Sequence, residues 1–239
     1  MNRDVAKRAA ANAAVALVED GMTVGLGTGS TAAMFVNALA ERVQQDKLRE
    51  VTCVATSESV AGRAITMGLR VVDLINEIDL AVDGADEVAF PDLRLIKGLG
   101  GALVREKIVA EAARRFIIIV DSGKLVDRLG IHVPLPVEII AFGAEQTCRR
   151  ILSLGVGARF RSLPEGGKVI SDNGNPIVDC YIGPERDVAW TNDLIRAMAG
   201  VIETGYFDTE IERVIVGDCS GTVKQLIAPA KKMVCRDVN

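Results

Sequence analysis

Four stretches of this 239-residue chain place glycines, hydroxyls, carboxylates and lysines at spacings that suit a ligand site. The first is GLGTGSTA over 25–32, which lies between a strand pattern and a helix pattern. Glycines let backbone N–H groups approach an anion, a helix N-terminus attracts negative charge, and Thr28, Ser30 and Thr31 add hydroxyl donors. The stretch therefore predicts a phosphate site, with simple helix capping by Ser30 or Thr31 as the alternative.

The same stretch also satisfies G-x-G-x-x-A when it is read from Gly27, a variant of the dinucleotide fingerprint. However, the second strand pattern ends in ATSES, with Thr56 and Ser57 where a dinucleotide site needs an acidic residue. No lysine follows the final glycine, which excludes a Walker A loop. A loop with this many donors therefore favours a phosphomonoester over a nucleotide.

The second stretch is DLAVDGADEV over 79–88, which puts four carboxylates into ten residues at the end of a strand pattern. Ligands bind at the carboxyl edge of open α/β sheets, and Asp83 and Asp86 are three residues apart across Gly84 and Ala85. We therefore expect both carboxylates to face one cavity. Capping of a turn or helix by either carboxylate, and a Mg²⁺ site, are the alternatives.

The third stretch is LIKGLGGALVREKIVAE over 95–111, again a strand, a glycine loop and a helix. Lys97 closes the strand, the glycines free backbone N–H groups, and Glu106 lies in the early turns of the helix. A solvated Lys97 and a Glu106 that merely pairs with the helix dipole are the alternatives. Together with the neighbouring carboxylates, a base, a cation and exposed N–H groups predict proton transfer next to a carbonyl.

The fourth stretch, DSGKLVDRLG over 121–130, repeats the strand-end pattern more weakly. Lys124 follows a strand pattern closely, so it reaches an anion at the sheet edge if the strands are neighbours. An ordinary surface lysine is an equally good interpretation of Lys124 from the sequence alone.

The elements that must position these residues follow from the apolar pattern of the first half. Short β-branched runs alternate with helical patterns, which predicts βαβ units and a mostly parallel, Rossmann-like sheet with helices on both faces. The strand patterns cover 23–27, 51–55, 70–74, 79–85, 93–98 and 116–121, and the helical patterns cover 3–19, 30–45, 58–68 and 102–115.

The second half has a different order of strand and helix patterns, which predicts a smaller α+β domain of the ferredoxin-like, split βαβ type. After a strand within 130–140 come helices near 144–154 and 187–199 and strands near 158–162, 168–173, 176–182 and 201–207. SDNGNPI over 171–177 predicts a hairpin turn. We expect a catalytic domain of residues 1–130 and 208–239, to which the apolar run 213–226 returns, and a small domain of residues 131–207.

Composition excludes several classes of protein. A net charge of −4 without a basic block gives no footprint for nucleic acid. We expect neither a membrane span nor a secretory leader, because no apolar run is long enough. Five scattered cysteines without a CxxC pair predict reduced thiols and a cytoplasmic location. With His132 as the single histidine, His-rich metal centres and Ser-His-Asp triads are disfavoured.

Taken together and in this order, GLGTGSTA, VDGADEV, LIKGLGGALVREKI, DSGKLVDRLG and PLPVEII resemble the ribose-5-phosphate isomerase A family over essentially the whole chain. The resemblance implies a metal-free interconversion of D-ribose 5-phosphate and D-ribulose 5-phosphate in the non-oxidative pentose phosphate pathway, and in carbon fixation in photosynthetic organisms. It implies no cofactor, and a homodimer or homotetramer assembled through the small domain.

The resemblance also implies roles for individual residues. Glu106 matches the proton-shuttling glutamate of the family. From the chemistry of the residues we expect it to move the proton through a cis-enediol, with Lys97 and nearby backbone N–H groups to stabilise the oxyanion. We expect Asp83 to open the sugar ring while Asp86 holds hydroxyls. Relatives commonly have glycine at the position of Leu99, which would be strained there if φ is positive and could narrow the pocket. The residues implied to bind substrate are Lys7, Thr28, Gly29, Ser30, Thr31, Gly84, Ala85, Gly98, Leu99, Gly100 and Lys124.

Two other classes of function remain open at this point. A sugar-phosphate sensor would share the architecture, but it has no need of Glu106 beside Lys97, and the chain shows no helix-turn-helix extension. An acyl-CoA transferase of similar fold would use a glutamate as nucleophile, but no CoA-binding surface is recognisable.

Overall fold

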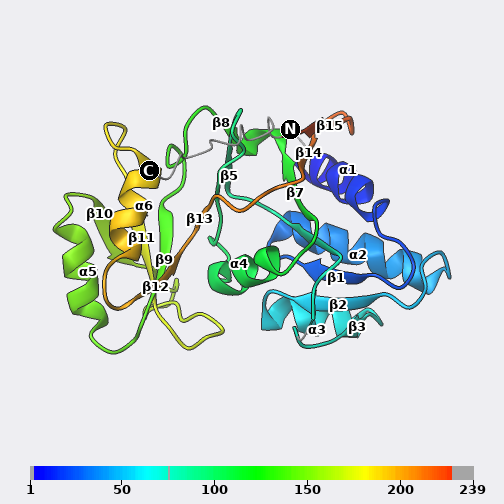
Figure 1. Ribbon diagram of the computed structural model, residues 1–239, viewed down its shortest axis with the longest axis horizontal. Helices are drawn as coiled ribbons and strands as arrows, with labels where there is room; N and C mark the ends of the chain where they lie inside the picture. The colour runs from blue at the N-terminus through cyan, green and yellow to red at the C-terminus, as the bar shows by residue number, and fades with distance from the viewer. Residues whose placement is uncertain (1–2, 75, 228–239) are drawn as a thin grey trace, which may run out of the picture.

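The computed structural model describes residues 3–74 and 76–227, and its largest element is a seven-stranded sheet (Figure 1). Its order is β15-β14-β7-β4-β1-β2-β3, parallel throughout except for β15, which runs antiparallel to β14. We call it the large sheet. Its strands are β1 (Thr23–Leu26), β2 (Thr52–Ala55), β3 (Arg70–Val71), β4 (Leu80–Asp83), β7 (Phe116–Asp121), β14 (Arg213–Gly217) and β15 (Val223–Leu226).

Helices cover both faces of the large sheet. Alternate residues of a strand point to opposite faces, so Ile117 and Ile119 of β7 join one core while Ile118 and Val120 join the other. The first core contains α1 (Arg3–Val15), α2 (Ser30–Gln44) and α3 (Glu58–Thr66), and the second contains α4 (Leu103–Glu111). The predicted α/β class is confirmed.

A second, antiparallel sheet of order β10-β11-β9-β12 lies at the other end of the molecule, and we call it the small sheet (Figure 1). Its elements follow the predicted β-α-β-β-α-β order. They are β9 (Leu135–Ile139), α5 (Ala144–Leu152), β10 (Gly157–Phe160), β11 (Ile177–Tyr181), α6 (Val188–Arg196) and β12 (Val201–Thr204). Apolar side chains of both helices pack with the strands in one core, for example Ile151 and Ile195.

A third sheet, which the sequence did not predict, lies between the other two (Figure 1). This middle sheet has the order β13-β6-β5-β8, and its strands come from three separate parts of the chain, 87–96, 125–126 and 206–207. The strands are β5 (Glu87–Ala89), β6 (Leu95–Ile96), β8 (Leu125–Val126) and β13 (Tyr206–Phe207). β6 lies within the strand predicted over 93–98, but it joins this sheet, antiparallel to both neighbours, and not the parallel one. Strands of two or three residues carry too little periodicity to show which sheet they join.

The single strand predicted over 201–207 is wrong, because Gly205 divides it into β12 of the small sheet and β13 of the middle sheet. The Gly205 N–H donates to Pro136 O at 2.7 Å, and Gly205 O accepts from the Lys97 N–H at 2.8 Å. A Cβ at position 205 would lie only 2.0 Å from Lys97 O. The close approach of two backbones therefore requires glycine here.

The strand predicted over 168–173 is also wrong, although the turn that follows it is correct. Only isolated bridges form there, Ser162 with Lys168 and Ile170 with Pro176. Gly174 has a φ of +80°, as an Asn-Gly turn requires, and its N–H donates to Ser171 O at 2.9 Å. The loop bonds instead to Glu138 and to Glu58 of α3, which are distant in sequence.

Other expectations concern the ends of elements and the thiols. The predicted helices extend beyond the observed ones; for example, the helix predicted over 3–19 ends at Val15. The run 213–226 does return to the large sheet, as β14 and β15. Across 3–74 and 76–227, no helix is long and apolar enough to cross a membrane. The thiols of Cys53, Cys148, Cys180 and Cys219 are free, and Cys235 lies outside the described residues.

Candidate active site

The loops that follow β1, β4 and β7 meet at one edge of the large sheet, because these strands are parallel and β4 lies between the other two. Together with the loop before α4 they surround a cavity of about 420 Å³, open mouth included. The residues that line it are Thr28, Gly29, Ser30, Thr31, Gly84, Ala85, Asp86, Lys97, Gly98, Gly100, Glu106 and Lys124. The structure thus gathers most of the predicted site residues.

Asp83 ends β4 and is held from below the cavity by two backbone N–H groups. Its Oδ1 accepts from the Gly84 N–H at 2.7 Å and from the Thr28 N–H at 3.1 Å. The adjoining Gly27 makes this possible, because a Cβ at that position would lie 2.0 Å from Asp83 Oδ1. Burial raises the pKa of Asp83, against the lowering effect of Lys97. The Asp83 carboxylate therefore caps the local turn through Oδ1 alone, and Oδ2 takes no part in the capping.

Lys97 is buried, with 2% of its surface exposed, so its interpretation as a solvated strand end is wrong. Its Nζ donates to Gly84 O at 2.6 Å and lies 2.9 Å from Asp83 Oδ2 and 3.5 Å from Glu106 Oε2. The Phe207 ring lies below it, with 5.5 Å from Nζ to the ring centroid. One ammonium group thus lies between two carboxylates in a place without solvent.

Glu106 projects from the first turns of α4 into the same place and is 3% exposed. Among the described residues, neither Glu106 Oε2 nor Asp83 Oδ2 accepts a well-directed hydrogen bond, and the partner of both is the Lys97 ammonium, at 3.5 Å and 2.9 Å. Buried carboxylate oxygens are normally satisfied. Two unsatisfied oxygens beside one cation indicate a site that awaits protons or hydroxyls from a ligand.

The charges of this cluster shift its proton affinities. Burial raises the pKa of Glu106 from 4.5 to about 8, and Lys97 offsets this effect only in part. The carboxylates of Asp83 and Asp86 raise the Glu106 pKa as well. Burial also opposes the Lys97 ammonium, but the attraction of Asp83 and Glu106 outweighs it and raises the Lys97 pKa. Near neutral pH the lysine is therefore charged and Glu106 is able to gain or lose a proton.

Leu99 does not have the strained conformation that a glycine-requiring position would impose. In the described part of the chain, the non-glycine residues with positive φ are Asp46, Glu50 and Leu93. The Leu99 side chain is 39% exposed and does not line the cavity, so it does not narrow it. Its backbone N–H donates to Asp86 Oδ2 at 2.9 Å, and this bond fixes the Asp86 carboxylate at the cavity wall.

The other end of the cavity is the N-terminus of α2. Its N-cap is Gly29, with a φ of +118°, and no side chain caps it, so the capping alternative for Ser30 and Thr31 is wrong. Ser30 Oγ instead accepts from Lys7 Nζ at 3.0 Å. Lys124, just after β7, is partly buried at the cavity wall rather than a free surface lysine. Uncapped N–H groups with two lysines nearby suit a phosphate dianion.

Thr56 and Ser57 support this loop, although from the sequence they are notable only because neither is the acidic residue that a dinucleotide site needs. Thr28 Oγ1 lies 2.7 Å from Thr56 Oγ1 and 3.0 Å from Ser57 Oγ, both at the end of β2. The Thr28 hydroxyl is thus occupied by protein partners, and its expected role as a free donor is reduced. The sequence signal for this contact is that β1 and β2 are neighbouring parallel strands, so the residues that follow them lie side by side.

A Mg²⁺ site is not apparent in the geometry. Within the ranges that the structure describes, no group of three or more His, Cys, Asp or Glu side chains is arranged to hold a metal ion. The position between Asp83 and Glu106, where a cation would balance their charge, is taken by the ammonium group of Lys97.

Comparisons with known proteins show the family of this chain. The family model of ribose 5-phosphate isomerase A (phosphoriboisomerase A) matches residues 52–221. A ribose-5-phosphate isomerase A of Gloeobacter violaceus is 49% identical over 92% of this chain and 96% of its own length. The solved ribose 5-phosphate isomerase A of Methanocaldococcus jannaschii gives a TM-score of 0.87 at 40% identity, over 94% of this chain and 98% of that one. A solved D-ribose-5-phosphate isomerase in complex with phospho-erythronic acid gives 0.89 at 38% identity, over 95% and 100%. The chain belongs to the ribose-5-phosphate isomerase A family.

Proposed function

We propose that Glu106 is the base of this aldose-ketose isomerase, which interconverts D-ribose 5-phosphate and D-ribulose 5-phosphate, and that the cavity described above is its active site. The observation that carries the proposal is the buried, unsatisfied Glu106 carboxylate beside the Lys97 ammonium. A base for this reaction must be shielded from water, close to a cation and able to change its protonation near neutral pH, and Glu106 combines these properties.

The substrate phosphate would bind at the N-terminus of α2. The backbone N–H groups of Ser30 and Thr31, with Lys7 and Lys124, would surround it with donors and positive charge. A relative that binds phospho-erythronic acid, a phosphorylated sugar acid, supports a ligand of this class here. The sugar carbons would then extend from this end of the cavity toward Glu106.

In the open-chain aldose, the Glu106 carboxylate would take the proton from C2. The C–H electron pair forms the C1–C2 double bond, and the carbonyl pair moves to O1, which gives a cis-enediolate. Lys97 would stabilise the charge on O1, a type of contact worth about 3–4 kcal/mol per well-placed donor. Glu106 would return the proton to C1, and transfer of the O2 proton to O1 completes the ketose.

The two aspartates would act on hydroxyl groups. Asp83 has one oxygen held by backbone N–H groups and one unsatisfied oxygen, so it is suited to open the furanose ring and to move protons between oxygens. Asp86, fixed by the Leu99 N–H, would accept hydrogen bonds from substrate hydroxyls. These roles need neither a metal ion nor an organic cofactor.

The remaining proposals concern the whole chain. We expect residues 1–130 and 208–239 to form a catalytic domain and residues 131–207 a small domain that carries the interface of a homodimer or homotetramer. Residues 1–2, 75 and 228–239 lie outside the described residues. The free thiols favour a cytoplasmic location.

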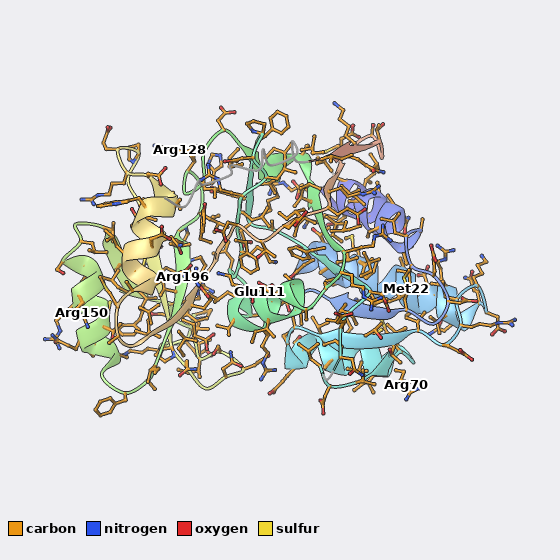
Figure 2. The ribbon with its side chains drawn as sticks, viewed as in Figure 1. Met22, Arg70, Glu111, Arg128, Arg150 and Arg196 are labelled. Carbon is orange, nitrogen blue, oxygen red and sulfur yellow. The ribbon has the colours of Figure 1, made fainter. Side chains whose placement is uncertain are left out.

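The deciding experiment measures conversion of ribose 5-phosphate by the purified protein in excess EDTA, beside the Glu106→Gln variant. Loss of a general base lowers kcat by about 10²–10⁴-fold, while phospho-erythronic acid should still bind. Glu111→Gln is a matched control, because Glu111 is an exposed glutamate at the end of the same helix (Figure 2). Near-normal turnover of Glu106→Gln would remove this residue from the role of base, and dependence on a metal would show as loss of wild-type activity in EDTA.

Two results would favour the other classes of function. A wild-type protein that binds sugar phosphates tightly but does not convert them would be a sensor. A covalent adduct between Glu106 and an acyl-CoA would indicate an acyl-CoA transferase.

A further inference from the structure

One arginine of the small-sheet region contacts the glycine loop of the active site. Arg161, directly after β10, donates through Nη1 to Gly98 O and to Leu99 O, both at 2.9 Å. Its side chain is 13% exposed and does not line the cavity. Arg161 therefore reaches the active site only through the backbone of this loop.

The guanidinium group of Arg161 is itself held in place by Asp179 of β11. Arg161 Nε lies 3.1 Å from Asp179 Oδ2, and Nη2 lies 2.5 Å from Oδ1. Such a two-point contact fixes the plane of the guanidinium as well as its position. Because Asp179 balances the charge, the effect of Arg161 on the loop is mainly directional and adds little net charge to the site.

The direction matters because a trans peptide points its C=O and its N–H to opposite sides. Arg161 binds the carbonyls of Gly98 and Leu99, so the N–H groups of the same two peptides, those of Leu99 and Gly100, point away from it. The Leu99 N–H reaches Asp86 Oδ2 at 2.9 Å. The Gly100 N–H has no acceptor among the residues that the structure describes, and Gly100 lines the cavity.

We infer that Arg161 is a positioning residue that turns the glycine loop so that the Gly100 N–H is presented to the oxyanion of the enediolate. This inference rests on the proposed function, since it assigns a second donor to the oxyanion that Lys97 stabilises. A donor fixed in advance needs no reorganisation when charge develops, and this preorganisation is the source of its effect on the rate. The same contact holds Asp86 in place through the Leu99 N–H.

The kinetic test is the variant Arg161→Met, which keeps the length and apolar stem of the side chain but removes its donors. Removal of one donor from an oxyanion site lowers kcat by about 10²–10³-fold. In Arg161→Met the Gly100 N–H is misdirected but still present, so we expect kcat to fall by about 10- to 100-fold. KM for ribose 5-phosphate should change by less than about threefold, since the phosphate end is untouched and only the Asp86 contact to a substrate hydroxyl is loosened. Arg161→Lys should recover only part of kcat, because an ammonium lacks the fork.

Arg159→Met is the matched control, because Arg159 lies on β10, two residues before Arg161, but its guanidinium contacts Tyr181. It should leave kcat and KM unchanged. Asp179→Asn, which weakens the support of Arg161, should lower kcat in the same direction but by less. Thermal unfolding of each variant shows whether it is folded at the assay temperature.

A binding experiment separates positioning from a general structural role and does not depend on turnover. Phospho-erythronic acid carries a planar carboxylate where the enediolate would be, whereas ribitol 5-phosphate carries a neutral alcohol. Arg161→Met should raise the Kd of phospho-erythronic acid at least about tenfold and that of ribitol 5-phosphate less than about twofold. Equal changes for both ligands, or none, would overturn the inference. Wild-type turnover in the same series tests the proposed function separately.

Discussion

At the scale of single residues, the chemistry depends on three charged groups that are buried in contact with one another. Asp83, Lys97 and Glu106 have too few hydrogen-bond partners to be satisfied together, and the unsatisfied atoms are the two carboxylate oxygens nearest the cation. A structural ion pair would be accompanied by further hydrogen bonds. The incompleteness of this cluster is what makes it a reactive site.

The pH dependence of the rate follows from Glu106. Its pKa of about 8 means that the carboxylate form needed to take the C2 proton becomes dominant only above that pH. We expect kcat/KM to rise by about tenfold per pH unit up to about pH 8 and then to level off. The second ionisation of the substrate phosphate lies near pH 6. A profile that is flat between about pH 6.5 and pH 9 would contradict this assignment.

The same pKa also predicts the pH dependence of stability. Between its ordinary pKa of 4.5 and about 8, Glu106 is protonated in the folded protein and ionised in the unfolded chain. The folded state then binds more protons, so the free energy of unfolding falls as the pH rises through this window. Chemical denaturation of the wild type and of Glu106→Gln across the window isolates this contribution, because the amide does not titrate. Parallel curves for the two proteins would show that the Glu106 pKa is not raised.

Asp83 could be chosen from the sequence because it closes a parallel strand, and ligands bind at the carboxyl edge of such sheets. Lys97 follows β6 of the middle sheet and Glu106 lies on α4, so their positions beside Asp83 depend on how the sheets pack. The strain expected at Leu99 could not be judged, since the sign of φ depends on how the loop closes. Arg161 carried no local signal, because its partners Gly98 and Leu99 lie more than 60 residues earlier in the chain.

At the scale of elements, α4 is attached to the segment between the small and middle sheets by Lys107, the neighbour of Glu106. Lys107 Nζ donates to Thr204 O at 3.0 Å and to Tyr206 O at 2.8 Å, and it lies 2.9 Å from Glu203 Oε1. Burial lowers the pKa of this lysine, against the attraction of Glu203. Arg196 of α6 (Figure 2) also contacts Glu203, at 3.2 Å. These bonds fix the position of α4, and with it that of Glu106.

The variant Lys107→Met should lower the free energy of unfolding by about 2–3 kcal/mol, because two buried carbonyls and part of a buried ion pair lose their donor. It should also lower kcat, since α4 is no longer fixed. Denaturant titration measures the first effect. Lys168→Met is the control, because Lys168 forms an exposed pair with Glu145 whose loss should cost less than about 1 kcal/mol. Equal losses in the two variants would mean that Lys107 does not fix the helix.

Long periodic elements were predicted with better bounds than short ones, and the sheet that a short strand joins was not predictable. The six residues of β7 were identified with correct ends, whereas the strands of the middle sheet have two or three residues each. The division at Gly205 depends on two backbones from distant segments, Pro136 and Lys97, and no pattern around residue 205 indicates it. Local sequence therefore determined the layers of the fold, but not the connections between them.

At the scale of the whole molecule, the turn near Gly174 joins the small-sheet region to the helices around the active site. Asp172 Oδ2 accepts from the Glu58 N–H of α3 at 2.8 Å, and Asn173 Oδ1 accepts from Arg105 of α4 at 3.0 Å. On its other side, Asn173 donates to the buried carboxylate of Glu138 at 3.2 Å. The motif SDNGNPI thus connects two helices of the large sheet with a strand of the small one.

Replacing Asp172 tests this connection. Asp172→Ala leaves an N–H at the start of α3 without its acceptor, so we expect a loss of about 1 kcal/mol in the free energy of unfolding. Asp172→Asn keeps an oxygen acceptor and should lose less. Hydrogen exchange at the Glu58 amide should be faster in the alanine variant. If the two variants are equally stable and Glu58 exchanges at the wild-type rate, the turn does not support α3.

The segment around Gly205 also has a consequence for the synthesis of the protein. A ribosome completes every side chain that we assign to catalysis by residue 106, yet the groups that hold Lys97 and α4 in place lie at residues 204–206. The middle sheet likewise cannot be completed until its last strand, β13, has been synthesised. The nascent chain therefore carries its catalytic groups for about a hundred residues of elongation in an unassembled state, several seconds at ordinary rates of translation. Activity therefore arises only after residues 204–206 have left the ribosome.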